Sequence, residues 1–230
     1  MSNRQRRLIA ILLGLMLVLA AGAWLWTSRT AQRPADATDA AIAVPSGEID
    51  PANDGRRITV SGPLETDAGA VDGELDVASK AALLFRDVEM YQWQERCVAN
   101  GCGQSMAWSA MRIDSSKFRE QSGNTNPDGF PFANARFAAH PIRVGRFTID
   151  PDLVAALPAK ARPVWIGDLP PNLAAIFRDA DGSLFSGDDI AQPKIGDLRV
   201  SYREVPLGEV TLTGVQRGNQ LVAAAAAHFR

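Results

Sequence analysis

The sequence contains few of the side chains that usually carry chemistry. Its 230 residues include only two histidines and two cysteines, and His140 and His228 are distant in sequence from the cysteine pair. Neither Gly-x-x-x-x-Gly-Lys nor Gly-x-Gly-x-x-Gly occurs, so the sequence does not indicate a phosphate-binding loop or a dinucleotide site. No serine or cysteine stands in a Gly-x-Ser-x-Gly context. We therefore expect no catalytic residue, no metal site and no cofactor.

A concentrated positive charge is also missing. The formal net charge is −2, and Arg4, Arg6 and Arg7 precede the first acidic residue, Asp36. Without these three arginines, residues 29–230 carry 21 basic and 26 acidic side chains. Binding to nucleic acid or to an anionic lipid surface requires a dense positive field. We therefore expect no nucleic-acid partner.

One long apolar run stands out near the start of the chain. Leu8 to Trp26 is 19 residues long and uncharged, and as a helix it measures about 28 Å, close to the thickness of a bilayer core. Three arginines precede it and the interfacial residues Trp24 and Trp26 end it, which predicts a single-pass anchor with residues 1–7 in the cytoplasm. The alternative is a signal peptide cleaved after the small residues 21–23. Either way, the main domain is expected in the periplasm, or in the lumen of a eukaryotic compartment.

The remaining chain is predicted to form a tether and one domain. Residues 27–40 are too polar and small to pack, so they indicate a flexible linker. Apolar residues return in 41–222, the expected folded domain, and 223–230 form a short apolar tail. Cys97 and Cys102 flank Asn100-Gly101, a dipeptide typical of hairpin turns, and export to an oxidising compartment favours a disulfide between them. A redox or metal site is the weaker alternative, because the spacing is not Cys-x-x-Cys.

The local patterns favour strands over helices. Residues 57–61 alternate as a strand that Gly62-Pro63 should stop, and residues 83–95 predict a long strand paired with 106–113. Asp150-Pro151 predicts a short helix through Leu157, and residues 172–178 predict another helical turn or two. Residues 196–203 alternate with Leu198, Val200 and Tyr202 on one face, and residues 206–208 should turn them into a hairpin with 209–215. We predict a β-rich α+β fold of antiparallel strands with a few short helices, preceded by one transmembrane helix.

Several residues are weighed for chemistry and found better explained by structure. His140 could act as a general base, but a partly buried structural histidine is the favoured interpretation. Asp179 to Ser183 resembles a calcium loop without its full ligand spacing, which favours a turn. Scattered carboxylates do not define an acid-base pair. Trp93, Trp108 and Tyr91 would be sugar-stacking residues if exposed, but aromatic residues at strand period are typical of a core.

Several motifs together carry a family resemblance. The hexapeptide Val88-Glu89-Met90-Tyr91-Gln92-Trp93 resembles the hallmark of the LUMA, or transmembrane protein 43, family. Further matching segments follow in the family's order: Trp108-Ser109, Ile113-Asp114-Ser115 with Phe118, Asn126-Pro127, Val144-Gly145-Arg146-Phe147, Ile195 to Tyr202, and Gln216-Arg217-Gly218-Asn219-Gln220-Leu221.

The resemblance implies a multi-pass membrane protein with a large lumenal domain between its first helix and a C-terminal membrane block. It also implies a place in the endoplasmic reticulum and inner nuclear membrane in eukaryotes, protein partners in envelope organisation, and no established catalytic residue. Two departures are a short cysteine-bearing hairpin and the missing C-terminal block. We expect a bacterial inner-membrane protein here.

The function expected is therefore that of a membrane-anchored, non-enzymatic binding or scaffold protein. Its partners would be the bilayer and a protein, including a second copy of the chain. Two alternatives are a cleaved, soluble periplasmic binding protein and an envelope hydrolase that uses His140. The candidate partner-binding positions are Glu89, Tyr91, Trp93, Asp197 and Arg199, although a buried polar network within the sheet is the favoured role of these residues.

Overall fold

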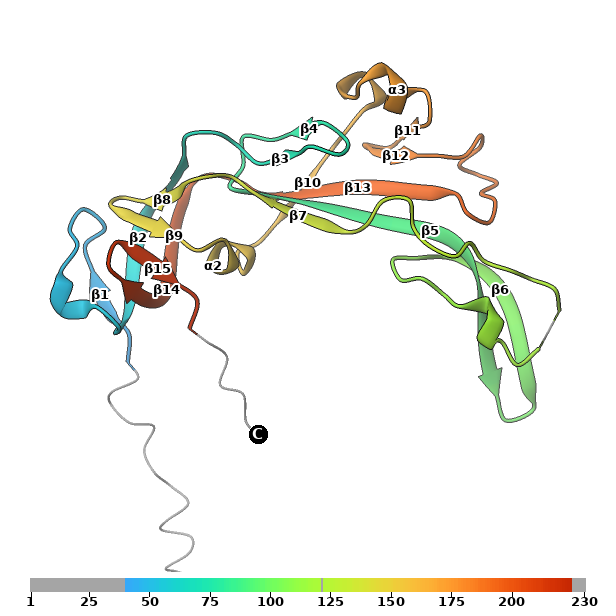
Figure 1. Cartoon of the computed structure of the whole chain (residues 1–230), viewed down its shortest axis with the longest axis horizontal. Coiled ribbons are helices and arrows are strands. Elements are labelled where there is room, and N and C mark those ends of the chain that lie inside the picture. The colour runs from blue at the N-terminus through green and yellow to red at the C-terminus, as the bar shows by residue number, and fades with distance from the viewer. Residues whose placement is uncertain (1–39, 121, 225–230) are drawn as a thin grey trace, which may run out of the picture. The chain divides into compact units, whose positions relative to one another are not determined.

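A computed structural model describes residues 40–120 and 122–224 (Figure 1). The predicted membrane helix with Leu8, Trp24 and Trp26, the stub before it, the linker up to residue 39 and tail residues 225–230 lie outside the described residues. Among the residues that are described, no helix is long and apolar enough to cross a membrane. Residues 1–40 and 41–230 form separate units. The fold described below is that of the second unit.

The first sheet closes on itself. Its six strands run in the order β1-β2-β14-β15-β9-β8, and β8 pairs in addition with β2. These strands are β1 (Ile42–Val44), β2 (Arg57–Thr66), β14 (Glu209–Arg217), β15 (Gln220–Val222), β9 (Phe147–Ile149) and β8 (Ile142–Val144). Every second residue of β2 is buried at its start, and Ile58 and Val60 are fully buried. The apolar side chains of this sheet therefore form one core.

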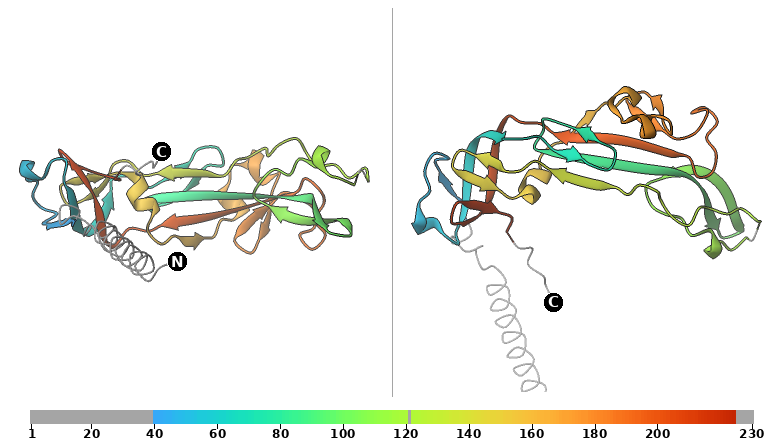
Figure 2. Two further views of the ribbon diagram at one scale, coloured as in Figure 1. Left: turned by 90° about the horizontal axis from the view of Figure 1, so that it is seen from below. Right: turned by 45° about the horizontal axis from the view of Figure 1, so that its top comes forward.

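The second sheet is built on one long antiparallel pair. β5 (Leu83–Val98) runs beside β13 (Leu198–Val205) over eight residue pairs and then beside β6 (Gly101–Ser109). Four shorter strands extend it: β11 (Arg178–Ala180), β12 (Ser183–Phe185), β10 (Lys160–Arg162) and β7 (Ala135–Ala138). A separate two-stranded ribbon is formed by β3 (Val71–Asp72) and β4 (Val77–Ala78). Figure 2 shows β5 and β13 side by side from two further directions.

The predicted fold class is wrong, because helices contribute almost nothing. In the part of the chain that the structure describes, the α-helices are α2 (Pro151–Ala155) and α3 (Pro171–Ala174), with three 3₁₀ turns at Pro51–Asn53, Ser115–Lys117 and Ile166–Asp168. Each is about one turn long, and the described chain is otherwise strands and loops. Asp150 does cap α2, since its carboxylate accepts the Asp152 N–H at 2.9 Å. The domain is a β protein rather than α+β.

Two strand predictions are also corrected. β2 continues through Gly62-Pro63, because these residues lie between the segment that pairs with β1 and the segment that pairs with β8, while β14 pairs along the other edge. The expected C-terminal hairpin is absent: β13 pairs with β5 in the second sheet, and β14 pairs with β2 in the first. Residues 206–208 therefore carry the chain from one sheet to the other.

Two apolar clusters fill the unit. The first joins the closed sheet to the beginning of the second sheet, because Leu83 of β5 and Val205 of β13 pack with Ile58 and Phe147. The second covers one face of β5 and β13, where Val88, Met90 and Val200 lie against apolar residues from the β3–β4 ribbon and α3. The other face of that sheet carries the candidate site.

Candidate functional site

The second sheet has one buried face and one open face. Alternate residues of β5 and β13, including Leu84, Val88, Leu198, Val200 and Tyr202, are buried, which confirms the predicted alternation. In Figure 1 the β3–β4 ribbon and α3 lie on one side of β5 and β13, and α2 lies on the other. The residues between the buried ones are partly or fully exposed. The open face is formed by Phe85, Asp87, Glu89, Tyr91, Trp93, Trp108, Arg199, Ser201 and Arg203.

Arg199 is the centre of one fixed group on the open face. Its Nε and Nη2 donate to Oε2 of Glu89, directly opposite on β5, at 2.9 and 2.6 Å. Its guanidinium carbon lies 4.8 Å from the centre of the Trp108 ring. Trp108 also contacts Tyr91, at 5.3 Å between ring centres, and Phe185, at 6.2 Å. The planar guanidinium is thus held by a carboxylate and an indole at once.

A second group of the same composition lies further along the strands. Arg203 donates to both carboxylate oxygens of Asp87, at 2.6 and 3.0 Å, and its guanidinium lies 5.1 Å from the centre of the Phe85 ring. These hydrogen bonds raise the pKa of Arg203 above its ordinary value. The open face therefore carries two arginine, carboxylate and aromatic groups whose charges are paired within the sheet.

Trp93 is positioned by the long loop between β6 and β7. Its backbone N–H donates to Oδ1 of Asn126 at 2.7 Å, and its backbone carbonyl accepts from Nδ2 of Asn126 at 2.8 Å. Asp197 lies just before β13, and its carboxylate accepts the Lys194 N–H at 2.8 Å. The structure thus brings Glu89, Tyr91 and Arg199 together around Trp108, whereas the Asp197 carboxylate is taken up by a turn.

A buried polar network does exist, but it is made of other residues. Arg86, Asp72 and Tyr202 are 3%, 0% and 2% exposed. Arg86 donates to Oδ2 of Asp72 at 2.8 Å, and the Tyr202 hydroxyl donates to the same oxygen at 2.7 Å. Burial, reinforced by the bond to Asp72, raises the pKa of Tyr202 well above its ordinary value. One feature of the sequence indicated this network: in the alternating pattern of β5, Arg86 falls at a position that faces the buried side of the sheet.

A disulfide joins Cys97 and Cys102 across the end of the β5–β6 hairpin, with 4.0 Å between their Cα atoms. Ligand atoms of Glu95 and the two cysteines lie within 4.8 Å of one another, but disulfide sulfurs are not thiolate ligands. Glu95 instead accepts the N–H groups of Arg119 and Glu120 at 2.8 and 3.0 Å. These bonds lower its pKa. The cluster fastens the following loop to the hairpin.

The structure shows the surroundings of the two positions weighed for chemistry, His140 and residues 179–183. His140 is exposed, not partly buried as predicted. It shares a hollow of about 240 Å³ with Asp150, whose carboxylate caps α2, and no hydrogen bond of the His140 ring is found in the described part of the chain. Asp181 and Gly182 have φ of 49° and 79° and join β11 to β12. Residues 179–183 therefore form a hairpin turn.

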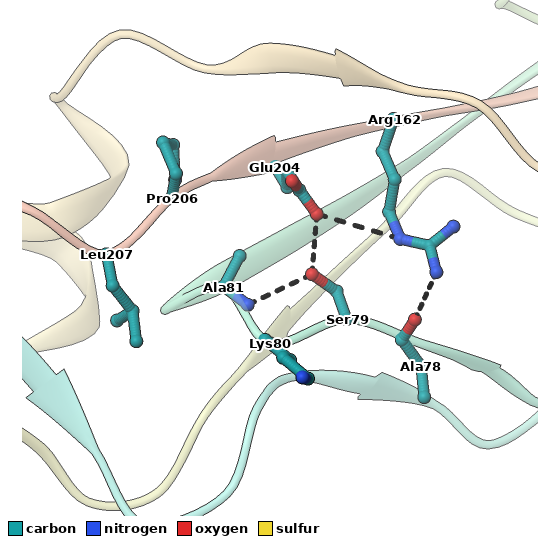
Figure 3. Close-up of a pocket in the computed structure, with 8 residues that line it drawn as sticks. All are labelled: Ala78, Ser79, Lys80, Ala81, Arg162, Glu204, Pro206 and Leu207. Carbon is teal, nitrogen blue, oxygen red and sulfur yellow. Dashed lines mark hydrogen bonds and ion pairs between the residues drawn. The ribbon is translucent and has the colours of Figure 1, made fainter.

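A hollow of about 600 Å³ lies where β4, β10 and β13 meet (Figure 3). Glu204 accepts from the Ser79 hydroxyl at 2.5 Å and lies 3.6 Å from Nε of Arg162, which also donates to the Ala78 carbonyl. Ser79 in turn accepts the Ala81 N–H at 3.0 Å. These bonds fasten three strands together, so the hollow is a structural junction and its glutamate is already engaged.

The family is decided by comparison with known proteins. A family model described as Transmembrane protein 43 matches residues 90–230. The chain belongs to the transmembrane protein 43 family. This confirms the resemblance drawn from the hexapeptide and the segments after it, and the matched range contains Tyr91, Trp93, Trp108 and Arg199 of the open face.

Members of the transmembrane protein 43 family align with about three quarters of the chain. Transmembrane protein 43 of Homo sapiens is 27% identical over 196 residues, which cover 76% of this chain and 48% of that protein. The Transmembrane protein 43 homolog of Drosophila melanogaster is 25% identical over 185 residues, covering 74% of this chain and 48% of the fly protein. The chain thus spans about half the length of these relatives. No solved structure matches it.

Proposed function

We propose that this protein is a membrane-anchored, non-enzymatic binding protein that holds a protein partner on the open face of its second sheet. One observation carries the proposal: Arg199, Trp108, Tyr91 and Glu89 form a fixed, partly exposed group beside a second group of the same kind. Arginine, tryptophan and tyrosine are the residues most enriched in the energetic centres of protein interfaces.

The geometry favours a protein over a strongly charged ligand. Each arginine of the open face already has a carboxylate partner, so the two groups add no net charge. A neutral face does not attract a polyanion over long distances. An immobilised guanidinium and indole lose little conformational freedom when a partner docks, which lowers the entropic cost of binding.

The membrane part of the proposal rests on family membership and on the apolar run. The relatives are named as transmembrane proteins, and residues 8–26 have the length and flanks of an inner-membrane anchor. In this proposal the N-terminus is cytoplasmic and the second unit is periplasmic. The intact mass of membrane-extracted protein tests the anchor, because cleavage after Ala23 would leave a mature chain that starts at Trp24.

Site-specific photocrosslinking in native membranes tests the open face. A photoreactive phenylalanine analogue at Tyr91 should give a discrete protein adduct, and Arg199→Ala in the same chain should reduce its yield about tenfold or more, as expected for an interface centre. The matched control carries the analogue at Trp165. This residue directly precedes the 3₁₀ turn Ile166–Asp168 and is 49% exposed.

The adducts also identify the occupant. An adduct of twice the chain mass would mean that the partner is a second copy, and an adduct of another mass would mean a different protein. Lipid adducts alone, or protein adducts that are equal from Tyr91 and Trp165, would refute the proposed binding face.

A further inference from the structure

Gln216 is a fully buried side chain with half of its amide unused. It belongs to β14 and is 0% exposed. Its Nε2 donates to the carbonyl oxygen of Asp50 at 2.9 Å. A carbonyl oxygen accepts hydrogen bonds only, so this contact fixes which end of the amide is nitrogen. The other end, Oε1, is the one buried side-chain polar atom in the described part of the chain without a hydrogen-bond partner.

Gln216 lines a pocket of about 300 Å³ on the first sheet. Its apolar walls are formed by Val44, Pro45, Ile49, Pro51 and Phe147. Its polar lining residues are Glu48, Asp50, Asn53 and Gln216, and none of these described lining residues is a lysine or an arginine. Buried acceptors in proteins are normally paired. The pocket therefore offers acceptors and negative charge in apolar surroundings, but no cation to balance them.

The pocket is held in shape by its own backbone. Asp50 caps the 3₁₀ turn Pro51–Asn53 through the Ala52 N–H at 2.9 Å. Gly55 N–H donates to the Gln216 carbonyl at 2.8 Å, and Gln216 N–H donates to the Arg56 carbonyl at 3.0 Å. Gly218 N–H bonds the Asp54 carboxylate at 2.7 Å. These bonds join the turn to the Gln-Arg-Gly segment and hold the backbone around Gln216 in place.

We propose that this pocket binds a cationic nitrogen group, a primary ammonium or guanidinium, on a short apolar stem. Because Oε1 of Gln216 is closed off in this structure, a shift of the side chain opens it to an N–H of the cation. The carboxylate of Glu48 balances the charge, and the stem lies against Ile49 and Phe147. Two sources carry this chemistry: a free small amine, and a lysine or arginine side chain of a peptide. The site is independent of the open face.

Ligand-observed NMR titration of the detergent-solubilised full chain tests the pocket. The probes are n-butylammonium, N-acetyl-lysine methylamide and n-butanol, which has the same stem but no charge. We expect saturable binding of the two cations and none of butanol. A lysine amide that binds at least tenfold more tightly than butylammonium would assign a peptide source, and the reverse order would assign a free amine.

Three variants give the matched comparison. Glu48→Gln removes the rim charge of an exposed residue and should weaken cation binding about tenfold. Gln216→Met keeps the side-chain volume, removes Oε1 and should abolish binding. Glu209→Gln, also exposed and located on β14 outside the pocket, should change nothing.

Some outcomes overturn the proposal. If butylammonium does not bind, or binds no better than butanol, the pocket is not a cation site. Equal affinities of Glu48→Gln and Glu209→Gln would do the same, and this comparison stands even if Gln216→Met fails to fold. Arg199→Ala should leave butylammonium binding unchanged, so failure here is distinguishable from failure of the open face.

Discussion

Two arginines of the second sheet hold carboxylates in very different surroundings. Arg86 and Asp72 are 3% and 0% exposed on the covered face, whereas the Arg203 and Asp87 side chains are 48% and 38% exposed on the open face. Burial of a charge is costly unless the charge is paired. Both pairs join an arginine to an aspartate, but they should contribute differently to the free energy of unfolding.

Arg86→Leu is predicted to destabilise the protein by about 3–5 kcal/mol, because it leaves the Asp72 carboxylate buried without its cation. Arg203→Leu is the matched control and should cost about 1 kcal/mol or less, as exposed ion pairs usually do. Urea unfolding of the full chain in detergent measures both. Equal losses in the two variants would show that burial does not separate the two pairs.

Glu95 is predicted to hold the loop after β6 in place in a pH-dependent way. The N–H groups of Arg119 and Glu120, opposed in part by burial and helped by Gln104, lower its pKa below the ordinary 4.5. A carboxyl whose pKa is lower in the folded state stabilises the fold above its ordinary pKa and loses this effect as the pH falls through the lowered value.

The amide NMR signals of Arg119 and Glu120 should therefore shift together on acidification, with a midpoint below 4.5. Glu95→Gln should abolish this titration at both amides. A shared midpoint at or above 4.5, or the same titration in the variant, would contradict the role of Glu95.

Two turns on the first sheet contain glycines with the same backbone angle and different surroundings. Gly145, between β8 and β9, has φ of +58°, and a Cβ there would lie 2.3 Å from the Ser46 carbonyl oxygen. Gly218, between β14 and β15, has φ of +59°, and a Cβ there would meet no atom within 4 Å. Both substitutions carry the cost of a left-handed conformation, roughly 1–2 kcal/mol, but only one adds a clash with backbone.

Gly145→Ala is accordingly predicted to be clearly more destabilising than Gly218→Ala. Thermal unfolding of the two variants beside the parent chain measures the difference. The clash should also loosen the contact of β8 with β2, so amide exchange at residues 64–66 should rise in Gly145→Ala alone. A smaller loss in Gly145→Ala than in Gly218→Ala would contradict the close approach to Ser46.

Individual elements were more predictable than their partners. Alternation identified β5 and the outward position of Arg199, Asp150-Pro151 located α2, and Asn100-Gly101 located the hairpin. The residues 206–208 marked a turn, but a turn signal does not say which strand comes next to which. The same limit applies to Arg86, since its parity indicates burial while the identity of Asp72 as its partner depends on the path of the β3–β4 ribbon.

At the scale of the whole unit, the first cluster shows why the sheets depend on each other. Leu83 and Val205 begin and end strands of the second sheet, yet they pack among Ile58, Phe147 and Leu221 of the first. The chain also passes between the sheets at residues 206–208. Neither fact is visible in the local pattern of the sequence, because contacts between distant segments decide both. Which face of the second sheet stays open depends on how the sheets are arranged. Alternation in the sequence, by contrast, was enough to predict which residues share that face.

Leu83→Ala is predicted to lower the stability of both sheets together, by about 2–5 kcal/mol, as for other large-to-small changes in a core. Leu83 is fully buried at the start of β5. Amide exchange of β13 and of β14 should accelerate by the same factor in this variant, because the two strands open in one cooperative step. Leu184→Ala, fully buried in the second cluster, is the companion variant and should also accelerate β14. If β14 instead keeps its full protection in both variants, the closed sheet is an independent folding unit, and the shared cluster is a contact between units rather than a common core.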